Sequence, residues 1–152
     1  MPDWPRFDEG RKRLNAEGDA FLNAHTRKGI LITNGRDGHP HAVPLVYFRV
    51  GDDLYVGGRR RTQRLVNIER DPKVSFLVED GWEWNSFQGL LMSGSAEIIS
   101  DEAEKLRIAR AAAEFRGEDE ASWPTEPPRG TLIRITPERY SSWDNSRVKP
   151  QG

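Results

Sequence analysis

Two tight turns, close together in the first half of the sequence, restrict its fold most strongly. Residues 28–34 and 41–50 are rich in β-branched and aromatic side chains, and the Asp-Gly pair at 37–38 between them is a strong β-hairpin signal. A second turn at 51–53 separates the second run from a short β-rich run at 54–56. Consecutive hairpins pair neighbouring strands in the antiparallel direction. The sequence therefore predicts an antiparallel sheet.

The rest of the chain adds strands and short helices to this sheet. Further strands are expected at residues 73–80, 87–100 and 131–143. Helices are expected at residues 8–24, 62–70 and 102–116, the last with Asp101 as its N-cap. Short helices inserted among hairpin-linked strands predict a mainly β (α+β) protein, a small antiparallel barrel of about six strands with short flanking helices.

Length, charge and the lack of cysteine limit the possible functions. A chain of 152 residues is expected to form a single domain, 1–152, with residues 1–25 as an N-terminal helical extension. The formal net charge of −1 disfavours bulk nucleic-acid binding, which usually requires a broad positive excess. The absence of cysteine excludes disulfides and thiolate metal sites. Since no apolar run approaches the roughly 20 residues of a membrane span, we expect a cytoplasmic protein.

Three consecutive arginines at 59–61 mark a candidate anion site. They follow a glycine pair at 57–58, which lets the backbone approach a ligand closely, and they precede the expected helix. Thr62 is well placed as the N-cap of that helix, whose first turn exposes free N–H groups. Arg64 adds a cation in the first turn, where the helix dipole disfavours it unless an anion is present. The pattern predicts a phosphate site, and the alternative is a set of solvated loop charges.

The order of the motifs also resembles a known protein family. The segments GHPHAVPLVYF, GDDLYVGG, RTQRLVNIERDPKV and GLLMSGSAEII follow one another within about residues 26–100. In this order they are similar to the pyridoxamine-5′-phosphate-oxidase-like split-barrel flavoproteins, including the general-stress and deazaflavin-dependent branches. The resemblance implies a split β-barrel that binds FMN at the interface of a homodimer.

The resemblance also implies which residues bind the cofactor. In the family a Ser-Arg-Lys-type stretch ahead of a short helix holds the cofactor phosphate, and here Thr62, Gln63 and Arg64 occupy that stretch. Arg64 replaces the lysine of the family and still suits a phosphate. The strand HAVPLVYF corresponds to the one that runs along the flavin ring. The implied cofactor-binding residues are Val43, Pro44, Leu45, Val46, Gly58, Arg59, Arg60, Arg61, Thr62, Gln63 and Arg64.

Three hypotheses about function follow from the resemblance. The first is an FMN-binding oxidoreductase that acts on a small organic substrate, in which the cofactor carries the electrons and no catalytic residue is expected. The second is a reductase that depends on deazaflavin (coenzyme F-420), because the extra arginines could meet the longer anionic tail of that cofactor. The third is a non-catalytic flavin- or haem-binding stress protein, because a fold does not dictate function.

Histidines and acids elsewhere give weaker signals. His39 and His41 share one face of a strand, but no third ligand cluster accompanies them, so no metal site is expected. Glu79, Asp80 and Glu83 could form a general acid–base pair, yet acids in a hairpin loop are more often solvated.

Tryptophans form the last candidate group. Trp82, Trp84 and Trp143 are expected to fill a dimer interface, where tryptophan is enriched. The alternative is that they cover a ring system or a substrate.

Overall fold

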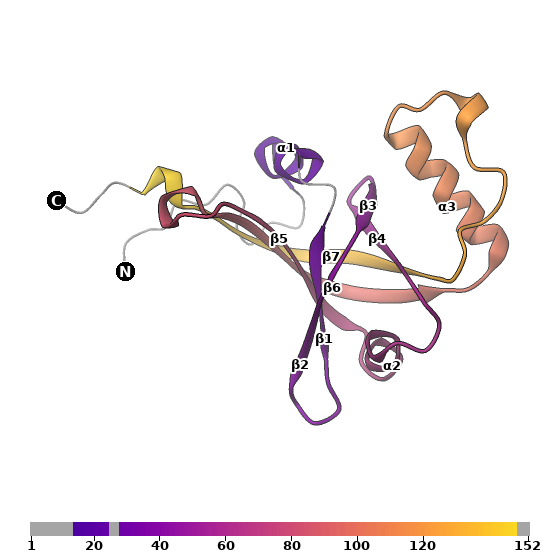
Figure 1. Ribbon diagram of the computed structural model, residues 1–152, viewed down its shortest axis with the longest axis horizontal. Coiled ribbons are helices and arrows are strands. Elements are labelled where there is room, and N and C mark those ends of the chain that lie inside the picture. Colours follow the sequence, from indigo (N-terminus) through magenta and orange to yellow (C-terminus); the bar gives the residue numbers. More distant parts are fainter. Residues whose placement is uncertain (1–13, 25–27, 149–152) are drawn as a thin grey trace.

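A computed structural model describes residues 14–24 and 28–148 of the chain. Its centre is a seven-stranded antiparallel sheet in the order β2-β1-β5-β6-β7-β4-β3, curved into a half-barrel (Figure 1). The strands are β1 (Gly29–Asn34), β2 (Pro40–Leu45), β3 (Tyr47–Val50), β4 (Asp53–Gly58), β5 (Lys73–Asp80), β6 (Gln88–Ile99) and β7 (Thr131–Asp144). The helices are α1 (Ala16–Ala24), α2 (Gln63–Arg70) and α3 (Glu102–Phe115), with short 3-10 helices η1 (Trp84–Ser86), η2 (Glu120–Ser122) and η3 (Asn145–Arg147). The predicted fold class is confirmed.

The two outer strands of the sheet, β2 and β3, are neighbours in the chain and are separated only by Val46. β2 pairs with β1, whereas β3 pairs with β4. The chain therefore bends at Val46, which is 75% exposed, and connects the two edges of the sheet covalently. The run expected at 41–50 thus forms two strands, which explains why there are seven strands instead of about six.

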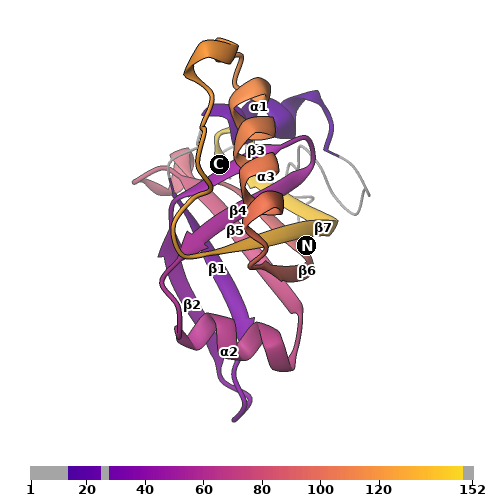
Figure 2. The same cartoon turned by 90° about the vertical axis from the view of Figure 1, so that its right-hand side faces the viewer.

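Side chains pack on both faces of the sheet. Leu54 and Val56 of β4 point into the barrel and belong to the larger buried cluster. Tyr55 lies between them and points to the opposite face, because side chains alternate along a strand. There it packs in a second cluster with Ile108 of α3. The helix α3 therefore covers the outside of the sheet beside β4 (Figure 2).

Helix α1 begins at Ala16, so Leu14 and Asn15, which the expected helix 8–24 included, are not helical. Asn15 is the N-cap: its Oδ1 accepts a hydrogen bond from the N–H of Gly18 at 2.8 Å. Residues 1–13 lie outside the described residues. Phe21 and Leu22 of α1 are buried in the larger cluster, so the helix contributes to the core.

Helix α3 and its cap agree with the sequence. Asp101 Oδ2 accepts a hydrogen bond from the N–H of Glu104 at 2.9 Å, so the predicted N-cap is confirmed. The carboxylate of Glu104 accepts from Arg107 at 2.6 Å and from Arg134 of β7 at 3.1 Å. These hydrogen bonds, that of Arg107 first, lower the pKa of Glu104 to about 2. The Glu104–Arg134 pair links α3 to the sheet.

The ends of β5, β6 and β7 extend beyond the barrel and form a projecting arm (Figure 1). Its tip is well defined, because Asn145 donates to the backbone oxygen of Phe87 at 2.8 Å and to that of Trp84 at 2.7 Å. Trp82 nevertheless is 96% exposed and Trp84 is 54% exposed. The arm therefore presents apolar surface on an ordered loop. Among the helices described, none is long and apolar enough to cross a membrane.

Candidate functional site

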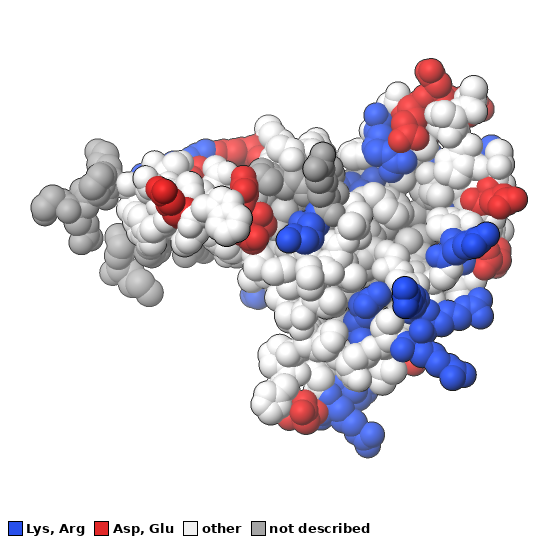
Figure 3. Space-filling model, in the orientation of Figure 1, with Lys and Arg blue, Asp and Glu red and all other residues white. Residues whose placement is uncertain are grey.

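The predicted phosphate site lies in the connection between β4 and α2. The side chains of residues 59–61 are exposed, and Lys and Arg atoms gather over this connection at the lower right of Figure 3. Arg61 has a φ of 62° and is the only non-glycine residue with a positive φ in the described part of the chain. This conformation costs a residue with a Cβ about 1–2 kcal/mol. Such strain is concentrated at functional sites, which supports a binding role for this turn.

Thr62 is the N-cap residue of α2 by position, as predicted, with an extended backbone at φ −102° and ψ 157°. Its side chain, however, makes no capping hydrogen bond. The hydroxyl oxygen Oγ1 is buried and has no hydrogen-bond partner among the described residues. The side chain of Thr62 therefore does not accept a hydrogen bond from the first turn of α2, as an N-cap side chain usually does. An anion at the start of α2 could accept from both the hydroxyl and the free N–H groups of the first turn.

The guanidinium of Arg64 lies directly against Gly58. A Cβ at position 58 would overlap Arg64 Nη2, so a larger residue there would displace the guanidinium. Arg64 Nε is buried and, within the described ranges, has no hydrogen-bond acceptor. Burial also lowers the pKa of Arg64. The cation is therefore partly desolvated, and like Thr62 Oγ1 it carries a buried polar atom without a partner among the described residues.

Asn67 fixes α2 against the barrel. It is fully buried, and its Nδ2 donates to Oγ1 of Thr33 on β1 at 2.9 Å. Its Oδ1 accepts from Nε2 of Gln63 at 2.8 Å. Leu65 and Ile68 supply the apolar side of the helix, as predicted. Asn67 was not identified from the sequence as a positioning residue, although a polar side chain on the core-facing side of a short helix is a usable signal.

The strand predicted to contact the flavin ring, β2, pairs only with β1 among the strands of the described residues, so one of its backbone edges is unpaired there. Val43 and Leu45 are half-buried and pack against the larger core cluster, whereas Pro44 and Val46 are exposed. Proline has no N–H to donate to a neighbouring strand, and an edge strand tolerates it because its unpaired side needs no donor. A planar ligand would meet this strand mainly through its backbone. The position of the ring itself remains a prediction.

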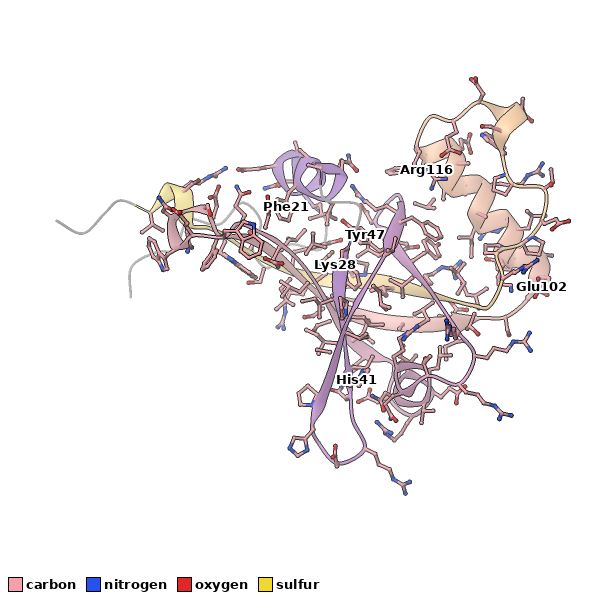
Figure 4. All side chains as sticks on the ribbon, in the orientation of Figure 1. Phe21, Lys28, His41, Tyr47, Glu102 and Arg116 are labelled. Atoms are coloured by element: carbon pink, nitrogen blue, oxygen red, sulfur yellow. The ribbon has the colours of Figure 1, made fainter. Side chains whose placement is uncertain are left out.

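A cavity of about 510 Å³ brings β2 and α2 together. It lies between the β1–β2 hairpin and α2, and its lining includes His41, Gln63 and Asn67. His41 lies on β2 (Figure 4), and its Nδ1 is buried without a hydrogen-bond partner in the described residues. His39 is exposed, and its Nδ1 lies 3.2 Å from Asp37 Oδ2. The two histidines thus have different surroundings: the Nδ1 atom of His41 is buried, whereas His39 is exposed and contacts Asp37.

The remaining sequence candidates lie on the arm. Glu79, Asp80 and Glu83 are exposed, and Glu83 caps η1 through a reciprocal contact with Ser86. Trp143 is half-buried and its ring covers Gly89, where a Cβ would overlap it. Trp143 therefore has a packing role within the arm. The described residues bring no three His, Asp or Glu side chains together in a potential metal site.

Comparison with known proteins agrees with this architecture. A family model described as pyridoxamine 5′-phosphate oxidase matches residues 14–144. The match includes the β2 strand, the arginine-rich connection and the arm. Comparison with curated proteins gives no match.

Solved structures share the fold. A conserved hypothetical protein from Mycobacterium tuberculosis has a TM-score of 0.66 at 24% identity, over 95% of this chain and 98% of that chain. An FAD-binding protein from Mesorhizobium loti has a TM-score of 0.62 at 21% identity, over 85% and 94% of the two chains. The haem storage protein HutZ from Vibrio cholerae has a TM-score of 0.60 at 16% identity, over 89% and 99%. Two of these neighbours are thus named for FAD and for haem, respectively.

Proposed function

The chain belongs to the pyridoxamine 5′-phosphate oxidase family, and on that premise we propose that it is an FMN-binding oxidoreductase that acts on a small organic substrate. We place the cofactor phosphate at the start of α2 and the ring along the free edge of β2. We further propose that the protein works as a homodimer with the cofactor at the interface, as the sequence resemblance implies.

The observation that carries this proposal is the pair of open donors at the start of α2. Thr62 Oγ1 and Arg64 Nε are both buried, and neither has a partner among the described residues. Buried polar groups without partners are uncommon and unfavourable, so their coincidence next to a helix N-terminus favours a bound anion. A phosphate offers several acceptor oxygens and can satisfy both donors as well as the backbone N–H groups.

The residues of this chain would bind and orient, whereas the cofactor would carry out the chemistry. A bound flavin supplies hydride or electron transfer. The Thr62–Arg64 segment would anchor its phosphate. The backbone of β2 would hold the ring by hydrogen bonds, and Val43 and Leu45 would keep that backbone in position by packing into the core.

Affinity for FMN tests the proposal directly. Arg64→Ala removes a charge-assisted contact of roughly 1.5–3 kcal/mol, so FMN should bind about ten- to a hundredfold more weakly. Quenching of flavin fluorescence during titration of the apo protein measures this change. The matched control is Arg110→Ala on α3, an exposed arginine, which should bind FMN like the wild type. Equal FMN affinity in the wild type and Arg64→Ala would exclude α2 from the phosphate site.

Two other cofactors are tested in the same titration. Deazaflavin (coenzyme F-420) is a second candidate, because Arg59, Arg60 and Arg61 are all exposed and exceed what one phosphate needs. Tighter binding of this deazaflavin than of FMN, with the difference lost when these arginines are replaced, would favour it. Haem would instead give a Soret band.

Anaerobic reduction of the bound flavin, followed by mixing with quinones or nitro compounds, distinguishes an enzyme from a flavin-binding protein without activity.

A further inference from the structure

A second cavity lies at the other end of the molecule from the proposed phosphate site. It has a volume of about 510 Å³ and is lined by Asn23, Tyr47, Phe48, Arg49, Phe115 and Arg116. These residues come from α1, β3 and the end of α3. Figures 1 and 2 both show these elements at the opposite end of the barrel from α2, and Figure 4 labels Tyr47 and Arg116 there.

Arg49 gives this cavity a buried hydrogen-bond donor. Its side chain is 3% exposed, and Nη2 binds Asp19 Oδ1 at 2.6 Å and the backbone oxygen of Gly51 at 3.0 Å. Nη1 donates to Asn23 Oδ1 at 2.9 Å. Nε is also buried, but it has no acceptor in the described ranges. The guanidinium is thus locked in position by three neighbours while one of its N–H groups stays unsatisfied, which is unfavourable in a buried site.

Aromatic rings form the other walls. Phe115 is 45% exposed, so one side of its ring is free to contact a ligand. Its ring lies 5.6 Å from the Arg49 guanidinium, which is cation–π geometry. Phe48 is half-buried and stacks on Tyr55 with ring centroids 5.2 Å apart. An apolar planar molecule could therefore cover Phe115 and rest against Phe48.

A second arginine sets the preferred charge of the ligand. Arg116 binds Glu118 through Nε at 2.7 Å. Its guanidinium carries further N–H donors that can serve a ligand. Arg49 pairs with one carboxylate of the chain and Arg116 with another. Both arginines line the cavity, so together they favour a ligand that brings a further carboxylate.

We infer that this cavity is a binding site for a small aromatic carboxylate, separate from the cofactor site. The ring of the ligand packs against Phe115 and Phe48, and its carboxylate accepts hydrogen bonds from Arg49 Nε and Arg116. The inference does not depend on the proposed flavin function, because it shares no residue with that site.

Benzoate, titrated into the full-length protein with and without FMN, is the probe. Saturable binding in the millimolar range is expected, with amide chemical-shift changes at Phe48, Arg49 and Phe115 in a 1H–15N NMR spectrum. Benzamide has the same shape without the charge, and it should bind several-fold more weakly. Phe115→Ala should weaken benzoate binding about tenfold. Phe87→Ala removes another exposed phenylalanine far from this cavity and should leave benzoate binding unchanged.

Arg116→Gln separates charge from shape. It should weaken benzoate binding but leave benzamide binding nearly unaffected, and because Arg116 is exposed the variant is expected to fold like the wild type. Absence of saturable binding, shifts that map to α2 instead of β3, or equal affinity for benzoate and benzamide would each overturn the inference.

Discussion

The side chain of Arg64 packs against Gly58 before any ligand is present. Its guanidinium occupies the space that a side chain at position 58 would fill. Thr62, at the N-cap of α2, and Arg64, in its first turn, both carry buried polar atoms without a partner among the described residues. A site that is organised in advance loses less conformational entropy on binding, so these two residues can contribute much of the affinity for an anion.

Gly58→Ala tests whether this packing matters for binding. The added methyl group would displace the Arg64 guanidinium, so FMN affinity should fall about tenfold. The double variant Gly58→Ala/Arg64→Ala should bind about as weakly as Arg64→Ala alone, because both changes act on the same contact. Gly57→Ala is the control, since a Cβ there would meet no atom within 4 Å. Fully additive effects in the double variant would contradict the assigned role of Gly58.

At the scale of secondary-structure elements, α2 depends on one buried polar contact for its placement. Its apolar residues fix how deep the helix lies, whereas the buried Asn67–Thr33 hydrogen bond, together with the exposed contact from Arg70 to the backbone oxygen of Asn34, fixes its rotation and register against β1. The first turn of the helix, with its open donors, follows from that placement. The polar contact is therefore expected to affect both stability and binding.

Thr33→Val should reveal both effects. The substitution keeps the shape but leaves Asn67 Nδ2 buried without its acceptor, at a cost of about 1–3 kcal/mol in the free energy of unfolding. Urea denaturation measures the loss, and FMN titration of the folded variant measures the accompanying loss of affinity. Thr33→Ser keeps the hydroxyl and should restore most of both. A Thr33→Val protein as stable as the wild type would show that the contact contributes nothing.

Helix α3 gives a prediction about pH. The pKa of Glu104 is lowered from 4.5 to about 2 by Arg107 and Arg134, so the folded state favours the charged form. Glu104 therefore stabilises the protein above pH 4.5, and its contribution is lost as the pH falls from 4.5 toward 2. The unfolding free energy of the wild type should fall more steeply over this interval than that of Glu104→Gln. Urea midpoints measured across the interval provide the test, with the exposed Glu114→Gln as control. Parallel curves for wild type and Glu104→Gln would refute the assignment.

The whole molecule is a half-barrel with an arm whose tip exposes two tryptophans. Exposed apolar patches are uncommon on monomeric proteins and usually mark an interaction surface. The arm is also fixed by Asn145, so it can present this surface without a large loss of entropy on association. A second copy of the chain is the partner that the proposed shared site requires.

Sedimentation velocity should therefore show a dimer at micromolar concentration. The double variant Trp82→Ala/Trp84→Ala should shift the population toward monomer, because it removes the most exposed apolar surface of the arm. FMN affinity should fall in the same variant if the cofactor lies at the interface. Phe115→Ala removes an exposed aromatic ring from another part of the surface and should stay dimeric. A wild-type protein that sediments as a monomer would contradict the shared site.

Local chemistry explains what could be predicted from the sequence. The Asp-Gly turn at 37–38, the Asp101 cap and the position of Thr62 at the start of α2 depend on residues close in the chain, and all three are confirmed. The bend at Val46 could not be read from a continuous β-rich run, because it arises only when β2 pairs with β1 and β3 pairs with β4 at opposite edges of the sheet.

The same limit applies to the candidate site. The arginine-rich connection was identified from the sequence, but the burial of Asn67 and the packing of Arg64 on Gly58 were not. The positive φ of Arg61 also has no sequence signal, since arginine does not favour that conformation. Each of these features depends on how the β4–α2 connection is placed on the barrel, and that placement is a property of the folded chain.

The edge of β2 that is unpaired within the described residues also bears on how the protein avoids edge-to-edge aggregation. An unpaired strand edge can accept a strand from another molecule, which is a common start of aggregation. Pro40, Ala42 and Pro44 direct their backbone groups to the same side of β2, because alternate residues share an orientation, and the two prolines have no N–H to offer. Proline in a strand normally turns its nitrogen away from the ladder, here toward the free edge. An intruding strand would therefore find acceptors along that edge but only one donor, so β2 stays open to a small ligand while resisting the addition of another chain.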